Sequence, residues 1–311
     1  MRPRAVVFAY HNVGVRCLSV LLAHDIDVAL VISHEDNPAE TIWFDSVAAL
    51  AGRHGIPVIT PDDPNAEPVL AQIAGLVPDF IFSFYYRLML KPALLAIPKR
   101  GAYNMHGSLL PKYRGRVPVN WAVIHGERST GATLHEMVAK PDAGRILAQQ
   151  AVPILPNDTA FEVFNKVTVA AEMALDDILP ALIDGTAQAR AQDLAAGSYF
   201  GGRKPEDGQI DWAQPALSVH NLIRAVAPPY PGAFFDTPAG RVIVQRSVRN
   251  GDLCGPHGRP TLYVQGDEFL AECGDGRTLR LLQIEFSGET LAGVSTDRFL
   301  TLFGAPALPL T

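Results

Sequence analysis

Cysteine is scarce in this sequence and does not occur in pairs. The 311 residues include three cysteines, Cys17, Cys254 and Cys273, and no two of them form a CxxC motif. Their odd number and wide spacing favour neither a disulfide framework nor a zinc site. Free cysteine is most often a small buried packing residue, and we expect that role for all three. A reducing cytoplasm is consistent with this usage.

Long hydrophobic runs are also missing. The N-terminal apolar stretch breaks off at His11 and Asn12, far short of the roughly 18 residues that a membrane span needs. No small-residue cleavage site follows a longer apolar run, so a secretory signal is not expected. With 48% hydrophobic and 19% charged residues, the composition is that of a globular protein. We therefore expect a soluble, cytoplasmic chain of two domains with no membrane partner.

The sequence has no excess of positive charge. Its formal net charge is −6, whereas a protein whose main ligand is a nucleic acid usually carries a basic patch. The one dense basic cluster consists of Lys112, Arg114 and Arg116. Nucleic acid is therefore an unfavoured partner, and small molecules are the expected ligands.

The glycine-rich loop GxGxxG does not follow the first apolar run. Residues 10–14 read YHNVG instead, so a dinucleotide-binding loop has no support there. The pattern along the first half nevertheless alternates between short apolar runs and helical periodicity. This alternation predicts an α/β domain with a mainly parallel sheet covered on both faces. The predicted strands are 5–9, 27–33, 57–60, 79–84, 101–106, 131–137 and 145–154, and the predicted helices are 13–23, 45–54 and 68–76.

A long helix is predicted from about residue 158 to 183. Thr159 and Glu162 have the spacing of a capping box, and Gly185 follows the last apolar position. Residues 195–208 are rich in Gly and polar groups and suggest a boundary. The remainder predicts a helix over 216–227 and a small antiparallel barrel with strands at 241–245, 261–264, 269–273 and 278–284. We thus expect a catalytic domain over 1–200 and a barrel over 201–311.

The segment that carries chemistry is 104–115, NMHGSLLPKYRG. It begins in a predicted strand, where Asn104 and His106 are two residues apart and so face the same side. A carboxamide can donate hydrogen bonds to an oxyanion, and an imidazole can move protons. Acyl transfer to an amine needs both. Asp142, in a predicted turn, is the candidate carboxylate that raises the pKa of the imidazole.

The pattern NxHxSLLPxYRG with a later D-A-G resembles the folate-dependent formyltransferases. Further segments resemble the formyltransferase domains of bifunctional polymyxin-resistance enzymes, which formylate UDP-4-amino-4-deoxy-L-arabinose for lipid A modification. This resemblance extends to about Phe234, whereas those enzymes continue into a dehydrogenase domain that this sequence does not include. The segments are FAYHNVG at 8–14, SHEDNP at 33–38, FSFYYR at 82–87, LLPKYRGRVPVNW at 109–121, GATLHEMV at 131–138 and AVAPPYPGAF at 225–234.

The resemblance implies a Rossmann-like N-terminal domain and an OB-like C-terminal barrel. It makes His106 the proton-transfer residue, Asn104 the group that stabilises the oxyanion, and Asp142 the group that raises the histidine pKa. The implied co-substrate is N10-formyltetrahydrofolate, with no metal. The implied folate contacts are Leu88, Met89, Leu90, Arg116, Val138, Ala139, Lys140, Pro141 and Asp142.

Several further residues are candidates for binding the acceptor substrate. They follow predicted strands or lie within the motif, and they combine aromatic with basic side chains: His11, Asn12, Tyr86, Arg87, Lys112 and Arg114. His135 and Glu136 receive no role. The sequence departs from its relatives at the apolar Leu88, at Pro141, and at Pro229-Tyr230, which bears on substrate detail more than on chemistry.

Two alternatives stay open. Methionyl-tRNA formyltransferases share the same trio, but they carry a basic insertion where residues 33–45 here read SHEDNPAETIWFD. This acidic stretch argues against a tRNA substrate. A non-catalytic folate or nucleotide-sugar binding protein is the other alternative, although such a protein would not need both an oxyanion donor and a base.

Overall fold

The computed structural model describes residues 2–38 and 42–310. The chain forms two compact units, each assembled from three stretches. The first unit comprises residues 1–118, 129–153 and 164–201, and the second comprises 119–128, 154–163 and 202–311. The functional division expected at residue 200 stays a prediction.

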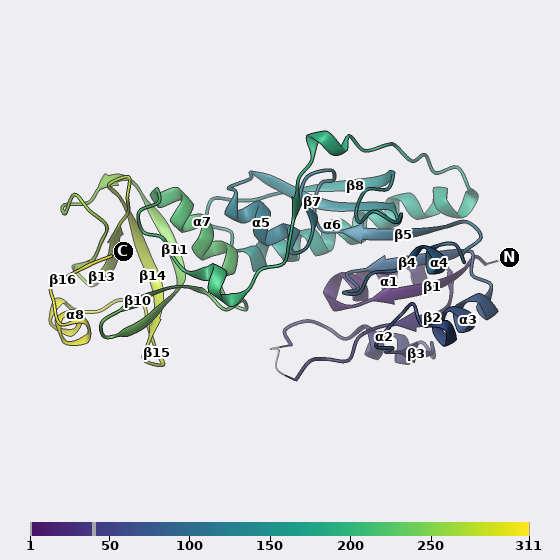
Figure 1. Cartoon of the computed structure of the whole chain (residues 1–311), viewed down its shortest axis with the longest axis horizontal. Helices are drawn as coiled ribbons and strands as arrows, with labels where there is room; N and C mark the ends of the chain where they lie inside the picture. Colours follow the sequence, from purple (N-terminus) through teal and green to yellow (C-terminus); the bar gives the residue numbers. More distant parts are fainter. Residues whose placement is uncertain (1, 39–41, 311) are drawn as a thin grey trace. The chain divides into compact units, whose positions relative to one another are not determined.

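The first unit contains a seven-stranded sheet of order β3-β2-β1-β4-β5-β7-β8 (Figure 1). The first five strands in this order pair in parallel, which confirms the Rossmann-like expectation. The last two pairings, β5–β7 and β7–β8, are antiparallel. The strands are β1 Arg4–Ala9, β2 Asp27–Ile32, β3 Val58–Ile59, β4 Phe80–Phe84, β5 Gly101–His106, β7 Ser129–Glu136 and β8 Ile146–Pro153.

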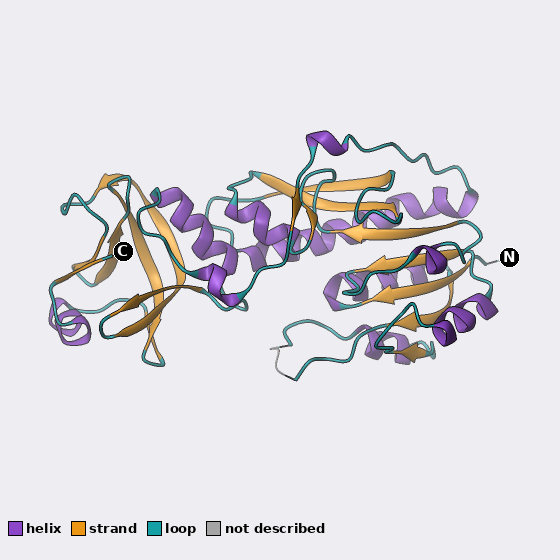
Figure 2. Ribbon diagram, viewed as in Figure 1, coloured by secondary structure: helices purple, strands orange, loops and turns teal. Residues whose placement is uncertain are grey.

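A helix follows each of the strands β1 to β4 in the chain, and a longer helix follows β8 (Figure 2). The predicted capping box of the long helix is confirmed: Thr159 N donates to Glu162 Oε2 over 2.7 Å, and Glu162 N donates to Thr159 Oγ1 over 3.2 Å. Two bonds between the first turn and its cap explain why the helix starts here. The helices are α1 His11–Ala23, α2 Val47–Arg53, α3 Glu67–Leu76, α4 Pro92–Leu95 and α6 Ala160–Asp184.

On one face of the sheet the side chains change from apolar to polar along the direction of the strands. Val6, Ile81 and Ala102 pack there against buried side chains of α3 and α4. Two residues further along β5, on the same face, stands Asn104, opposite Ser83 of β4. Because side chains alternate in a strand, Ala102, Asn104 and His106 all point to this face. The apolar side chains pack the sheet against α3 and α4, and the polar side chains further along β5 are the candidates for a functional site.

The second unit is built on an antiparallel sheet of order β10-β11-β14-β13-β12-β16, with β15 paired to β14. Trp212, Phe269 and Phe299 are fully buried in its core. The antiparallel expectation is confirmed, but β11 is much longer than the predicted strand because bulges interrupt its alternation. The elements are α5 Pro118–Ile124, α7 Ala216–Val226, β10 Ala233–Thr237, β11 Gly240–Cys254, β12 Thr261–Gln265, β13 Glu268–Glu272, β14 Arg277–Phe286, β15 Glu289–Leu291, α8 Thr296–Phe303 and β16 Ala307–Pro309.

The cysteines follow the packing expectation in two cases out of three. Cys17 and Cys273 are buried, whereas Cys254 is exposed at the end of β11, so the expectation is wrong for that residue. Within the described part of the chain, no helix combines the length and the apolar character that crossing a bilayer requires.

Candidate active site

Three strand residues of the candidate site lie side by side on the polar face of the sheet. Asn104 and His106 come from β5, and the antiparallel pairing places His135 of β7 directly opposite Asn104. His106 and His135 are both buried, with 6% and 2% of their surface exposed. The site therefore lies on the face of β5 and β7, not only at the carboxyl edge of the sheet.

Asp142 completes the site from the loop that joins β7 to β8. Its Oδ1 lies 3.6 Å from His106 Nδ1 and 3.5 Å from His135 Nε2. Its Oδ2 accepts a hydrogen bond of 2.8 Å from the Gly115 backbone N–H. The structure thus brings together the three residues that the sequence analysis selected, together with His135, to which that analysis gave no role.

The protonation of His106 follows from its hydrogen bonds. Its Nε2 lies 2.8 Å from the Tyr113 carbonyl oxygen, which can only accept, so Nε2 carries the proton. In the neutral ring Nδ1 is then the basic nitrogen, and it is the one that faces Asp142. Burial lowers the pKa of His106 below its ordinary value, while the Asp142 charge acts in the opposite direction.

The expected direction of the histidine pKa therefore needs a correction. Asp142 does favour protonation of His106, as predicted, but desolvation outweighs it and the net pKa shift is downward. For Asp142 itself, burial acts to raise the pKa; the neighbouring His106 charge and the hydrogen bond from the Gly115 N–H outweigh it and hold the pKa well below the usual range. The pair consequently rests as a carboxylate beside a neutral imidazole.

His135 is the functional candidate that sequence reasoning missed. Its Nδ1 lies 2.8 Å from the Glu136 carbonyl oxygen and donates to it. In this tautomer Nε2 accepts, and it lies 3.1 Å from Asn104 Nδ2. One N–H of the Asn104 amide is thus held by His135 and the other is left for a ligand. The sequence held no signal for this contact, because a strand pattern does not reveal the direction or register of pairing.

Backbone strain is concentrated around the same residues. Tyr85, Tyr113, Val117 and Asp142 all have positive φ angles, of 58°, 56°, 46° and 52°. Such angles cost energy in non-glycine residues and persist where the surroundings enforce them, commonly at functional sites. The positive φ angles are therefore consistent with a functional site at these loops.

Gly144 allows the Asp142 loop to lie against the end of β7. A Cβ added to Gly144 would overlap the Glu136 carbonyl oxygen. Gly144→Ala should therefore destabilise the protein by about 1–3 kcal/mol and displace Asp142. Gly52→Ala is a matched control, because Gly52 lies within α2 with nothing near its added Cβ, and it should be neutral or slightly stabilising. Urea unfolding compares them, and equal midpoints for the two variants would contradict the packing argument.

The residues expected to contact folate fall into two groups. Leu90 is buried in the apolar cluster of α3 and α4, against which Met137 also packs. Leu88, Met89 and Val138 instead expose 40%, 58% and 42% of their surface, and exposed apolar side chains of this size suit a flat heteroaromatic ring. Arg116, Ala139 and Lys140 are also exposed, and Pro141 is half-buried.

His11 lies in an aromatic cluster at the carboxyl end of β1. Its ring centroid is 4.0 Å from that of Phe44 and 4.5 Å from that of Trp43. Burial and the nearby Arg87 charge lower the pKa of His11 to about 3, so it stays neutral. Asn12 is engaged by its Oδ1, which accepts from the Asp45 backbone N–H over 2.7 Å. Both side chains thus contact other residues of the chain, and their role in binding the acceptor stays a prediction.

The remaining candidates for acceptor binding differ in accessibility. The Tyr86 ring stacks on His34 at 4.1 Å, and the Arg87 guanidinium lies 4.8 Å from the centre of the Tyr10 ring. Lys112 is exposed. Arg114 is buried and its guanidinium lies 3.4 Å from the carbonyl oxygens of Leu194 and Ser198, a position suited to holding the loop.

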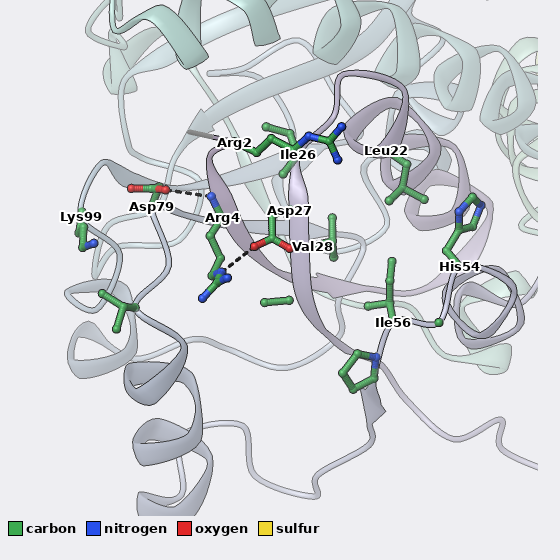
Figure 3. Close-up of a pocket in the computed structure, with 14 residues that line it drawn as sticks. Arg2, Arg4, Leu22, Ile26, Asp27, Val28, His54, Ile56, Asp79 and Lys99 are labelled. Carbon is green, nitrogen blue, oxygen red and sulfur yellow. Dashed lines mark hydrogen bonds and ion pairs between the residues drawn. The ribbon is translucent and has the colours of Figure 1, made fainter.

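A cavity of about 920 Å³ lies at the opposite edge of the sheet from the candidate site (Figure 3). The Arg4 backbone N–H donates there to Asp79 Oδ2 over 2.8 Å, and Arg4 Nε donates to Asp27 Oδ2 over 2.7 Å, so the guanidinium is already paired with Asp27. The residues that line it come from the amino ends of β1 and β2, from the end of α1 and from the segments that precede β3, β4 and β5, and none is a predicted site residue. Among the described residues, no group of three or more His, Cys, Asp or Glu side chains could hold a metal ion.

Two family models match this chain. The model described as formyl transferase matches residues 15–179, and the model of the formyl transferase C-terminal domain matches residues 203–296. Together they cover most of both units.

Solved structures share the fold at low sequence identity. The N-formyltransferase from Helicobacter canadensis, in complex with folinic acid and dTDP-3-aminofucose, has a TM-score of 0.69 and 21% identity, over 90% of this chain and 99% of that one. A sugar N-formyltransferase from Shewanella has a TM-score of 0.63 and 20% identity, over 79% and 97%. HypX from Aquifex aeolicus in complex with tetrahydrofolic acid has 0.61 and 19%, over 97% of this chain and 47% of that one.

Proposed function

Since this chain belongs to the formyl transferase family, we propose that it transfers the formyl group of N10-formyltetrahydrofolate to the amine of a nucleotide-linked amino sugar. The observation that carries the proposal is the convergence of Asn104, His106, Asp142 and His135 on one face of the sheet. The constellation supplies the oxyanion donor and the base that acyl transfer to an amine requires.

In this mechanism the sugar amine attacks the formyl carbon directly. A new carbon–nitrogen bond forms, and the free N–H of Asn104 stabilises the negative charge that develops on the formyl oxygen. His106 accepts the proton of the attacking amine at Nδ1, and Asp142 stabilises the resulting imidazolium. When the bond to N10 breaks, His106 returns that proton to N10. The products are a formamide and tetrahydrofolate, and no net proton is gained or lost.

A neutral resting His106 suits this order of events. Its lowered pKa keeps Nδ1 unprotonated and ready to accept. The imidazolium forms only while the adjacent Asp142 carboxylate can balance it. An amine is already a good nucleophile, so no covalent enzyme intermediate is needed.

The finer assignment is UDP-4-amino-4-deoxy-L-arabinose, with a role in lipid A modification and polymyxin resistance. It rests on the segments that resemble the polymyxin-resistance formyltransferases, above all FAYHNVG and FSFYYR. The dTDP-3-aminofucose in the Helicobacter structure makes a dTDP-linked amino sugar the principal rival substrate. Both belong to the proposed class, amino sugars carried on a nucleoside diphosphate.

A tRNA substrate is disfavoured by charge. The stretch 33–45 contains Glu35, Asp36 and Asp45, which would repel phosphate; its residues 39–41 lie outside the described part of the chain. A purely binding role is disfavoured because Asn104 and His106 lie on one face of β5, as the proposed oxyanion donor and base require and as ligand binding alone would not.

The test is a panel of acceptors. The protein is incubated with N10-formyltetrahydrofolate and, separately, with UDP-4-amino-4-deoxy-L-arabinose, dTDP-3-aminofucose or methionyl-tRNA, and each acceptor is analysed by mass spectrometry. A gain of one formyl group on the UDP sugar supports the full proposal, and a gain on the dTDP sugar alone supports only its class. Formylation of the tRNA alone, or folate binding without transfer to any acceptor, would contradict the proposal.

The contact between His135 and Asn104 predicts a measurable loss when it is removed. His135→Phe should lower kcat by up to roughly 10²-fold, because the amide of Asn104 would lose the partner that orients it. The KM values should change little. His54→Phe, at an exposed position, is the control and should leave both parameters unchanged. A kcat within twofold of the parent for His135→Phe would show that Asn104 needs no such partner.

A further inference from the structure

The segment 190–200, defined here as the brace, runs past both loops of the candidate site. It begins beside β8, where Arg190 and Ile146 exchange two backbone hydrogen bonds of 2.8 Å. It ends in the short strand β9, Tyr199–Phe200, which pairs in parallel with β6, Arg114–Gly115. Between these ends it contacts the Asp142 loop through Gln192 and the 107–116 loop through Ser198.

Gln192 holds the backbone on both sides of Asp142. Its Nε2 lies 3.0 Å from the Asp142 carbonyl oxygen and 2.6 Å from that of Gly144. Both partners are acceptors, so only the amide nitrogen can serve them, and a flipped amide would set oxygen against oxygen. Because Asp142 has a positive φ angle of 52°, its loop needs such external support to keep its shape.

Ser198 acts on the other half of the site. Its Oγ accepts the Tyr113 backbone N–H over 2.9 Å, and its carbonyl oxygen accepts the Arg114 N–H over 3.0 Å. Tyr113 is the residue whose carbonyl oxygen holds Nε2 of His106. Ser198 therefore holds the backbone of the same residue whose carbonyl oxygen fixes the His106 ring.

The brace also packs tightly against the 107–116 loop. A Cβ added to Gly197 would overlap the Pro111 carbonyl oxygen, and one added to Gly115 would overlap that of Phe200. Gly115 in turn donates its N–H to Asp142 Oδ2. Each end of the His106–Asp142 pair is thus tied to the same eleven-residue stretch (190–200).

We propose that the brace sets the separation of His106 and Asp142, with Gln192 and Ser198 as its positioning residues. Proton transfer is sensitive to displacements of about 1 Å, and the 3.6 Å between Nδ1 and Oδ1 is a distance between the end of β5 and the loop that joins β7 to β8. The brace bonds both to that loop and to the 107–116 loop that holds the His106 ring. Its kinetic consequences rest on the proposed function, whereas its effect on His106 does not.

The experiment compares Gln192→Leu with the parent and with Gln188→Leu. Leucine keeps the approximate volume of glutamine but donates no hydrogen bond. Gln188 is an exposed glutamine just before the brace that also donates to a backbone carbonyl, that of Thr186, so it is a matched control. The first readout is the pKa of His106 in the protein alone, followed by NMR of the imidazole and assigned with His106→Ala.

In Gln192→Leu the pKa of His106 should fall further, because a displaced Asp142 no longer favours the imidazolium. The second readout is kcat with the formyl donor and the accepted amine, which should drop about 10–100-fold with KM values nearly unchanged. Gln188→Leu should match the parent in both. An unchanged His106 titration in a folded Gln192→Leu protein would overturn the proposal, even if the parent proved to transfer no formyl group.

Gln192→Glu and Ser198→Ala keep the proposal testable if the leucine variant does not fold. A glutamate at position 192 repels both carbonyl oxygens when ionised but can donate again when protonated. Its kcat relative to the parent should therefore rise as the pH is lowered from about 8 to about 5.5, a range that spans the titration of a buried carboxyl group. Ser198→Ala should lower kcat severalfold without such pH dependence. If the kcat of Gln192→Glu relative to the parent does not change with pH, the amide N–H groups of Gln192 do not have the proposed role.

Discussion

Replacing His106 by alanine should lower kcat for formyl transfer by about 10³-fold, within the range that general acid–base catalysis contributes. The variant loses the imidazole, whose Nδ1 takes the proton from the attacking amine and returns it to N10 of the folate in the proposed mechanism. KM for the folate should change little, because only 6% of the His106 surface is exposed and the ring offers little area for contact in the ground state. His54→Ala, at an exposed position, serves as the control. Turnover of His106→Ala near that of the parent would remove the base from the mechanism.

The same role fixes the pH dependence of the parent. Only neutral His106 can accept a proton, so kcat should rise with pH and level off above the pKa of His106. Burial lowers that pKa, so the midpoint should lie below the ordinary value of about 6.5. Asp142→Asn should shift this acidic limb to still lower pH, because the carboxylate raises the pKa of the ring. A shift to higher pH would contradict the assigned sign.

Changing Asn104 to aspartate should lower kcat by about 10²- to 10³-fold, the usual cost of removing one oxyanion donor. The substitution keeps the shape but replaces the N–H groups by a carboxylate oxygen, which can only accept. The interaction forms in the transition state, so the loss should fall on kcat rather than on KM. Asn165→Asp, at an exposed position of α6, is the control. A raised KM with an unchanged kcat would assign Asn104 to substrate binding instead.

Local signals in the sequence predicted much of this structure. The strand 101–106 coincides with β5, because Gly101 precedes an apolar stretch that ends at the polar motif. The start of α6 follows from Thr159 and Glu162, whose contact spans three residues. The trio Asn104, His106 and Asp142 could be selected because two members share a strand and the third lies in a recognisable motif.

The contacts that complete the site were beyond sequence reasoning because they are long-range. His135 meets Asn104 only because β7 runs antiparallel to β5, and an apolar strand pattern carries no information on direction. Gln192 and Ser198 act on residues 50 and 85 positions earlier. The lowered pKa of His106 likewise depends on the burial that these loops create, so its direction could not be read from the neighbouring carboxylate alone.

Isotopic labelling can follow the formyl group itself from the folate to a sugar amine. N10-formyltetrahydrofolate labelled with ¹³C in the formyl group is mixed with the protein and an amino-sugar nucleotide, and the label is followed by NMR. The label should appear as a formamide on the sugar nitrogen, and His106→Ala and Asn104→Asp should slow its appearance. Label released as formate in the presence of the amine, or retained on the folate, would contradict the proposed transfer.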